Sequence, residues 1–305
     1  MTSYVIETKN LTKKYKKEIV LDSVNIKVEK GKIYGLLGKN GAGKTTTMSI
    51  ILNLAKASDG EVKLFGLDFK DNPQVYSRIG SIIETPGFYY NLTGFENLQI
   101  LAKLRGNYNE DNVNEALKIV SLDDEPKKLV KHYSLGMKQR LAIAAAIMDF
   151  PELLILDEPI NGLDPVGIQD MRKLFRELVN KYGMTIFISS HILSEIEHVA
   201  DVIGIIDKGK LIEEISMDNL HEKLNSYVDF EVSDYKSAAD ILTSLGFNDN
   251  DFEMKNVDGN EFLRIFSNLD KRADINEEFV KAGLKVYKQN LAGESLEEYF
   301  LNLIK

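Results

Sequence analysis

The chain has 305 residues, of which 44% are hydrophobic and 28% charged, a composition close to the average for globular proteins. At roughly 150 residues per domain, this length suggests two domains. The longest apolar run covers eight residues, 141–148, whereas a membrane-spanning helix needs about 20. We therefore expect no membrane helix.

The absence of cysteine excludes a disulfide scaffold, a thiolate metal site and a cysteine nucleophile. The first residues lack the basic and apolar regions of a secretory signal, so a cytosolic location is expected. The net charge is −9, with 10 Lys and Arg against 17 Asp and Glu from His221 onward, and 28 against 30 before it. Because neither part is basic, nucleic acid is not expected as a partner.

Residues 1–220 alternate short β-rich apolar runs with segments of helical periodicity. This alternation predicts an α/β domain with a largely parallel sheet. The continuous apolar run at 153–156 predicts a central strand that is covered on both faces. Strands are expected at 24–28, 33–37, 79–83, 153–156, 185–189 and 202–206, and helices at 44–54 and 95–105.

Residues 221–305 have a different pattern and form a predicted second, accessory domain. Their expected order of elements is βαββαβ, which is the ferredoxin-like arrangement. A last helix is predicted from Ser295, because Ser295 and Glu298 have the spacing of a capping box. The expected strands are 227–232, 251–255, 262–266 and 284–288, and the expected helices are 237–245 and 275–282.

Residues 38–45 fit the pattern G-x-x-x-x-G-K-[ST] of a phosphate-binding P-loop, and they follow a predicted strand and precede a predicted helix. Backbone N–H groups of such a loop close around phosphates, and the helix N-terminus adds partial positive charge. Lys44 is expected to reach the β- and γ-phosphates, and the Thr45 hydroxyl can ligate Mg²⁺. The predicted nucleotide-binding residues are Gly38, Lys39, Asn40, Gly41, Ala42, Gly43, Lys44, Thr45 and Thr46.

Two carboxylates follow the predicted central strand. Asp157 is expected to hold Mg²⁺, directly or through water, because Coulomb attraction is strong in a partly dry site. Glu158 comes one residue later, so the strand backbone turns its side chain in another direction. A carboxylate there can accept a proton from the attacking water or orient that water. The alternative for Glu158 is a structural hydrogen bond at the strand end.

Between these two motifs the chain reads YSLGMKQR at residues 133–140. Here the sequence resembles the ATP-binding cassette (ABC) ATPases, whose signature has the form LSGGQ before QR. Three positions of the pattern differ, whereas Ser134 and Gly136, which meet the γ-phosphate in the family, are retained. An ordinary helix N-cap is the alternative for Ser134.

Three further residues match family positions one at a time. Tyr15 falls where an aromatic ring stacks on adenine, with a core or surface tyrosine as the alternative. Asp164 belongs to a segment that resembles the nucleotide-binding D-loop, and it also suits a helix N-cap before Pro165. His191 matches the switch histidine that contacts the γ-phosphate, so the resemblance adds it to Glu158 as a catalytic residue.

Glu84 departs from the family pattern, which has a glutamine after the strand predicted at 79–83. Its negative charge near Asp157 and Glu158 must lie against Mg²⁺ to offset the repulsion. Glutamate at this position and the form of the signature are similar to those of bacitracin-export and lantibiotic-immunity ATPases. The metal ligands implied by the resemblance are thus Thr45, Glu84 and Asp157.

The resemblance covers residues 4–216 and implies a P-loop NTPase of the ABC type. Such a fold has a mixed sheet with helices and a helical signature subdomain, here at about 85–150, and the small C-terminal domain is expected to be α+β. ATP and Mg²⁺ are the implied ligands, and ATP hydrolysis is the implied activity. The two domains are predicted to span 1–220 and 221–305.

The implied function is that of an ABC exporter subunit which energises a separate membrane permease, in antimicrobial peptide resistance. A single cassette holds half of each site, so a second copy is expected as a partner. The resemblance thus places the chain in the cytoplasm, peripheral on the inner face of the membrane through the permease. The alternative is a soluble ABC-type switch acting on ribosomes or DNA. A small-molecule kinase on a P-loop fold would not explain the signature, the D-loop and His191 together.

Overall fold

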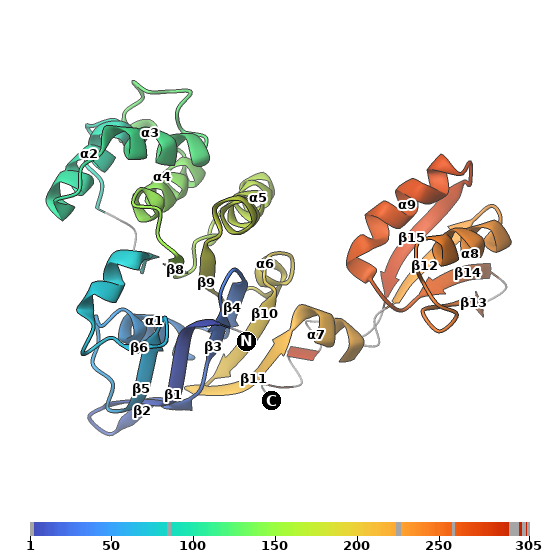
Figure 1. Cartoon of the computed structure of the whole chain (residues 1–305), viewed down its shortest axis with the longest axis horizontal. Coiled ribbons are helices and arrows are strands. Elements are labelled where there is room, and N and C mark those ends of the chain that lie inside the picture. The colour runs from blue at the N-terminus through green and yellow to red at the C-terminus, as the bar shows by residue number, and fades with distance from the viewer. Residues whose placement is uncertain are drawn as a thin grey trace. The chain divides into compact units, whose positions relative to one another are not determined.

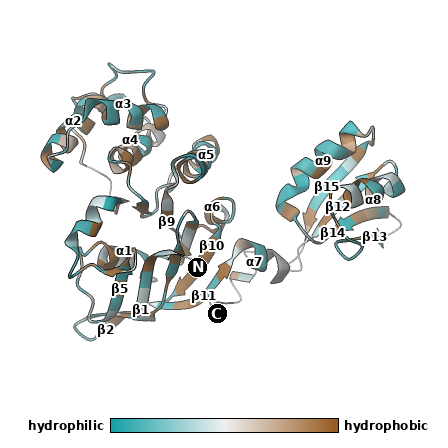
Figure 2. Cartoon of the chain, viewed as in Figure 1, coloured by the Kyte–Doolittle hydropathy of each residue, from teal (hydrophilic) through white to brown (hydrophobic). Residues whose placement is uncertain are grey.

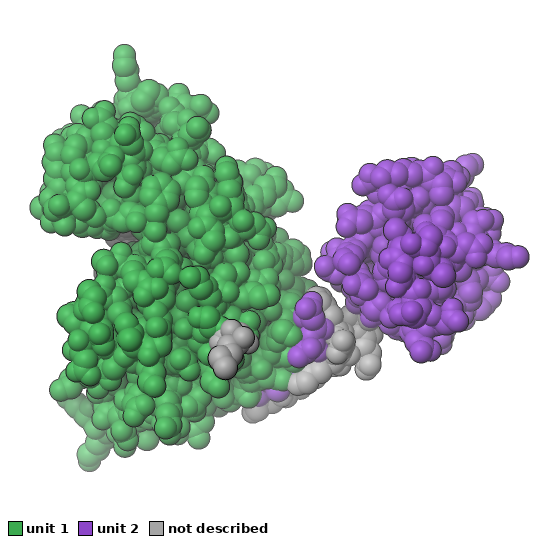
Figure 3. Space-filling view, in the orientation of Figure 1, with its two compact units in different colours: residues 1–217 green, residues 218–305 purple. Residues whose placement is uncertain are grey.

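The computed structural model describes residues 3–83, 87–223, 227–257, 260–292, 299–300 and 303. The chain divides into two compact units, residues 1–217 and 218–305 (Figure 3). The strands of the first unit are β1 (Tyr4–Tyr15), β2 (Glu18–Val24), β3 (Lys27–Glu29), β4 (Ile33–Leu37), β5 (Asp59–Leu64), β6 (Leu67–Asp68), β7 (Ile79–Ile82), β8 (Leu153–Leu156), β9 (Thr185–Ser190), β10 (Val202–Asp207) and β11 (Lys210–Ser216). Its helices are α1 (Lys44–Ile51), α2 (Gly94–Arg105), α3 (Glu110–Ile119), α4 (Leu135–Ile147), α5 (Pro165–Tyr182) and α6 (Leu193–Glu197), with 3₁₀ turns at Pro73–Arg78 and Val130–His132.

A six-stranded sheet carries the ends of the chemically important loops. Its order is β11-β10-β4-β9-β8-β7, and all neighbours are parallel except the antiparallel pair of β10 and β11. Strands β4, β8 and β9 are buried along their whole length, as continuous apolar runs predict. Apolar residues run along β10 and through α4 (Figure 2). The predicted α/β class is therefore confirmed.

A second, antiparallel sheet has the order β2-β1-β5-β6, with β3 also paired to β1. The single strand expected at 24–28 is wrong, because β2 ends at Val24 and β3 begins at Lys27. The Thr8 hydroxyl accepts a hydrogen bond from Ile26 N at 2.8 Å and donates to Val24 O at 3.0 Å. Together with the backbone bond from Thr8 N to Ile26 O at 2.9 Å, this buried hydroxyl bridges the break between the two strands. One apolar cluster contains residues of both sheets and of α1, so α1 is held between them.

The helices α2, α3 and α4 form a separate cluster within the first unit (Figure 1). Thr93 and Glu96 make a capping box at the start of α2, and Asn109 caps α3. Gly106 ends α2 in the left-handed conformation with φ +78°, which glycine adopts without strain. These local signals fix short helices whose apolar sides pack against one another.

The second unit has its own apolar core, in which the rings of Phe230 and Phe279 lie 5.3 Å apart. Its sheet order is β13-β14-β12-β15, which with the chain order βαββαβ is the ferredoxin-like arrangement. The helix predicted from Ser295 lies largely outside the described residues. The elements are β12 (Tyr227–Val232), α8 (Tyr235–Ser244), β13 (Phe252–Val257), β14 (Asn260–Ile265), a 3₁₀ turn at Leu269–Lys271, α9 (Arg272–Lys281) and β15 (Val286–Ala292), preceded by α7 (Met217–Lys223). No helix in the described ranges is both long and apolar enough to cross a bilayer.

Candidate active site

The loop between β4 and α1 has glycines where its backbone packs closely against neighbouring residues. A side-chain Cβ at Gly38 would lie 2.4 Å from the carbonyl oxygen of Ile206. Gly43, at φ +112°, begins α1 without a side-chain cap, in a conformation that favours glycine. The N–H groups of this first helical turn are therefore available to an anion, as a phosphate site requires.

Lys44 is the cation of this loop and is only 5% exposed. Its Nζ donates to Gly38 O at 2.7 Å and lies 3.2 Å from Glu158 Oε1. A buried ammonium is stable only when it is paired and hydrogen-bonded. The loop carbonyl and the carboxylate satisfy that need and hold the amine at the rim of the loop, where it can meet phosphate oxygens.

Thr45 and Asp157 bring two oxygen ligands together. The Thr45 hydroxyl donates to Asp157 Oδ2 at 2.6 Å. Hydroxyl and carboxylate oxygens suit Mg²⁺, which is commonly held by one or two carboxylates and the phosphates of the substrate. The described residues contain no group of three His, Cys, Asp or Glu that could hold a metal without such phosphates. This donor set fits Mg²⁺ bound together with ATP.

Glu158 is shared between two basic side chains. Its Oε1 faces Lys44, and its Oε2 is hydrogen-bonded to His191 Nδ1. The residue has φ +50°, a left-handed conformation that is uncommon outside glycine. That turn directs the carboxylate from the end of β8 toward the P-loop. The structure thus brings together the P-loop, Asp157, Glu158 and His191.

Ser134, Gly136 and Asp164 form a second group within the first unit, apart from the P-loop. Ser134 caps α4 by accepting from Met137 N at 3.2 Å, and Asp164 caps α5 by accepting from Gly167 N at 2.9 Å. All three line a hollow of about 570 Å³. The N-cap function and a phosphate contact are compatible, because a capping hydroxyl still borders the open space.

The remaining predicted residues have different placements. Tyr15 ends β1 and is 51% exposed, and Lys13 Nζ lies 4.5 Å from the centroid of its ring. Lys39 and Asn40 are exposed, and Thr46 is half-buried on the first turn of α1. Glu84 lies outside the described residues, so its place among the metal ligands stays a prediction.

Two serines at the end of β9 make polar contacts that were not predicted from the sequence. The Ser189 hydroxyl donates to Asp157 Oδ1 and accepts from Glu158 N at 3.0 Å. The Ser190 hydroxyl donates to the buried Glu195 carboxylate at 2.7 Å. Two polar residues at the end of an otherwise apolar strand could have indicated these contacts, because buried polar groups need hydrogen-bond partners.

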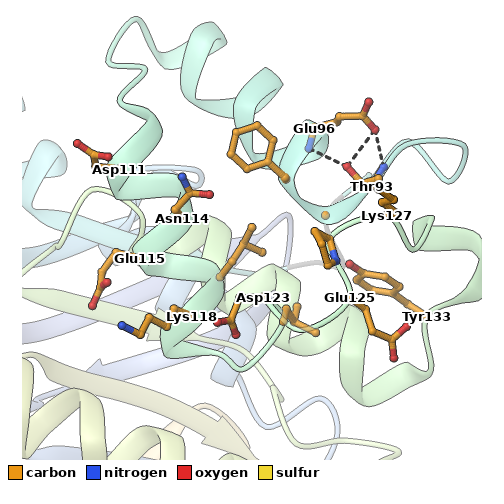
Figure 4. A pocket seen from close by; sticks show the side chains of 15 residues that line it. Thr93, Glu96, Asp111, Asn114, Glu115, Lys118, Asp123, Glu125, Lys127 and Tyr133 are labelled. Atoms are coloured by element: carbon orange, nitrogen blue, oxygen red, sulfur yellow. Dashed lines mark hydrogen bonds between the residues drawn. The ribbon is translucent and has the colours of Figure 1, made fainter.

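A further hollow, of about 760 Å³, lies beside α2 and α3 (Figure 4). The Thr93–Glu96 capping box borders it, together with the carboxylates of Asp111 and Glu115 and the amine of Lys118. None of the described residues that line it belongs to the predicted nucleotide site. We therefore assign it no role in nucleotide binding.

Comparison with known proteins agrees with this geometry. The profile described as ABC transporter matches residues 21–161. The bacitracin transport ATP-binding protein BcrA of Enterococcus faecalis is 54% identical over 99% of this chain and 96% of its own. The lantibiotic transport ATP-binding protein SrtF of Streptococcus pyogenes is 44% identical over 74% of this chain and 99% of its own. A solved ATP-binding subunit of an ABC transporter is 32% identical, with a TM-score of 0.62 over 72% of this chain and 92% of that one.

The fold and the site define a P-loop ATPase with the ABC signature. The chain belongs to the ABC transporter family and is an ATP-hydrolysing subunit of it. The family and the ATPase activity predicted from the sequence are confirmed.

Proposed function

We propose that this chain energises the export of a peptide antibiotic of the bacitracin type through a separate membrane permease. The observation that carries the proposal is the extent of the similarity. The bacitracin transport relative matches 99% of this chain, and therefore nearly all of residues 218–305, whereas the lantibiotic transport relative matches only 74%. The second unit is therefore shared with the bacitracin relative, which favours bacitracin over a lantibiotic.

The proposed division of the chain assigns residues 1–220 to the ATPase and 221–305 to an accessory domain. The nucleotide would lie on the P-loop with its adenine on Tyr15, and Thr45, Asp157 and Glu84 would surround the metal ion. When bound, Mg²⁺ neutralises charge on the phosphate oxygens. Ser134, Gly136 and Asp164 would serve the nucleotide of a second copy. These assignments of residues to the nucleotide, the metal ion and the second copy are the ones predicted from the sequence.

In the proposed reaction, the γ-phosphate enters between Lys44 and Glu158. Lys44 then turns from the carboxylate to the phosphate oxygens, because these carry more charge. Glu158 Oε1 becomes available to the attacking water, while His191 retains Oε2 and fixes the orientation of the carboxylate. Water attacks the γ-phosphorus as Glu158 Oε1 takes one of its protons, the bond from phosphorus to the bridging oxygen breaks, and ADP and phosphate leave while the proton is released to solvent.

Two copies and a permease complete the proposed assembly, with this chain on the cytoplasmic face of the membrane. ATP bound by both copies would close them together, and hydrolysis would reopen them. This cycle provides the conformational work that a membrane partner can use.

The test replaces the gene in its host with Glu158→Gln and measures growth in bacitracin and in a lantibiotic. We expect sensitivity to bacitracin to rise to that of a deletion strain, with no change for the lantibiotic. The control is Glu152→Gln, just before β8, whose carboxylate pairs with Arg78 at 2.7 Å and Lys30 at 3.2 Å. Unchanged bacitracin sensitivity in the Glu158→Gln strain would contradict the proposed substrate.

A further inference from the structure

The Ser189 hydroxyl joins the carboxylate of Asp157 to the backbone N–H of Glu158 in the proposed active site. The side chain lies at the end of β9 and is 0% exposed. The hydroxyl donates its proton to Asp157 Oδ1 and accepts the N–H of Glu158 at 3.0 Å. Both its donor and its acceptor capacity are therefore directed at the acidic pair.

The contact fixes Asp157 from the side opposite the P-loop. Thr45 donates to Oδ2 at 2.6 Å while Ser189 donates to Oδ1. A carboxylate held at both oxygens cannot rotate about its Cβ–Cγ bond without losing a hydrogen bond. The oxygen facing Thr45 thus stays in the orientation that the proposed metal site needs.

The same hydroxyl supports the turn that aims Glu158. This residue has φ +50° and its carbonyl accepts from Asn161 N at 3.2 Å. Non-glycine residues keep such a conformation only when surrounding contacts determine it. An N–H that lost its buried acceptor would be left unsatisfied, which favours a different turn and a displaced carboxylate.

The neighbouring serine does not share this role. Side chains alternate across a strand, and the Ser190 hydroxyl contacts Glu195 and Ile192 N instead, at 2.7 and 2.9 Å. Position 189 lies next to the end of β8, because Leu156 pairs with Ile188 in the parallel ladder. The next positions in that register are Asp157 and Ser189.

We propose that Ser189 is a positioning residue that holds Asp157 and Glu158 in catalytic geometry, an inference that rests on the roles proposed for these two carboxylates. Ser189→Ala should lower kcat about 10- to 100-fold, as loss of outer contacts to active-site ligands does. The Kd for ATP should remain close to the parental value, because the P-loop backbone and Lys44 are untouched. The amide of Glu158 should exchange with solvent faster in the nucleotide-free protein.

The matched control is Thr185→Val on the same strand. Thr185 is also 0% exposed, and its hydroxyl accepts Gly31 N at 2.9 Å, at the other end of β9. Its loss should lower the melting temperature as much as Ser189→Ala does while leaving kcat unchanged. Equal kcat in both variants would overturn the proposal, because Ser189 would then contribute only to stability.

A double-mutant cycle with Glu158→Gln separates this proposal from the site itself. If Ser189 acts through Glu158, adding Ser189→Ala to Glu158→Gln should cost far less than tenfold. Additive losses would overturn the proposal, whereas parental activity in Glu158→Gln alone would overturn the proposed site. Ser189→Cys keeps the volume but weakens donor and acceptor, so its kcat should be intermediate. A parental kcat in Ser189→Cys would also overturn the proposal, even if Ser189→Ala does not fold.

Discussion

The P-loop half of the site and the signature half satisfy their polar groups in different ways. Around the P-loop, Lys44 pairs with Glu158 and Thr45 with Asp157, so charges and hydroxyls are matched within the chain. Around the signature, Ser134 and Asp164 accept only from their own helix starts as far as the described contacts go, and they border an open hollow. The first half has, within one chain, the groups proposed to hold a nucleotide. The second half leaves its polar groups at an open hollow, as the proposed contact with the nucleotide of a second copy requires.

The largest expected effect comes from Glu158→Gln in the P-loop half. Glutamine keeps the shape but cannot take a proton from water, so kcat should fall by about 10²- to 10⁴-fold. ATP should still bind, and the closed dimer should accumulate, which light scattering with and without Mg-ATP would show. Near-parental turnover would remove Glu158 from the mechanism.

Ser134→Ala tests the signature half by removing the hydroxyl that is proposed to contact the phosphate. A hydroxyl bonded to a charged phosphate contributes about 1.5–3 kcal/mol, so ATP-driven association should weaken about 10- to 100-fold, while each monomer still binds ATP. Light scattering in the Glu158→Gln background measures this association. Thr93→Ala is the control, since it removes an N-cap of about 1 kcal/mol from α2. The same loss in both variants would mean that Ser134 is only a helix cap.

Within the P-loop half, the sequence indicated some residues and missed another. The P-loop, Asp157 and Glu158 lie in short segments whose residue types are dictated by phosphate and metal chemistry. Ser189 contacts Glu158 from 31 residues away and Asp157 from 32, through the register of β8 and β9. No local pattern encodes that register, so its contacts emerged only from the structure.

The fold shows the same division between local and distant information. Apolar runs predicted the buried strands β8, β9 and β10, because each is recognisable by itself. The antiparallel sheet was not predicted, because β1 lacks a clean alternation and bends at Asn10, where φ is +50°. Its pairing depends on partners such as β5, which lies far along the chain.

Glu84 is expected to have a smaller effect than the two substitutions above, at a position that lies outside the described residues. Glu84→Gln keeps a carbonyl oxygen and removes one negative charge, so the Mg²⁺ concentration for half-maximal ATPase activity should rise only modestly. Bacitracin resistance should fall while basal ATPase activity survives, and Glu84→Ala should be worse in both assays because no oxygen remains. If Glu84→Ala behaves like the parent and shifts stability by no more than about 0.5 kcal/mol, the residue is an ordinary surface glutamate.

Glu214 offers the mildest test, because it lies on β11, away from both halves. Tyr34 reaches it across Gly204, where a Cβ would lie 2.2 Å from the tyrosine oxygen, and donates to Glu214 Oε2 at 2.7 Å. Burial raises the pKa of Glu214 above its usual 4.5. Protonation therefore stabilises the folded protein, an advantage present below pH 4.5 and lost as pH rises through the raised pKa.

Glu214→Gln should accordingly raise the melting temperature at pH 8, by no more than about 4 °C, because glutamine can accept the tyrosine hydrogen bond without a buried charge. The gain over the parent should shrink as pH falls toward 4.5 and vanish below it. The exposed Glu61 on β5 is the control, and Glu61→Gln should show no such trend. Since neither residue borders the P-loop or the signature hollow, kcat and ATP-driven association should stay parental in both variants. A change in kcat for Glu214→Gln would mean that the β-sheet beneath the P-loop transmits strain to the first half of the site, and that this half is less self-contained than its pairings indicate.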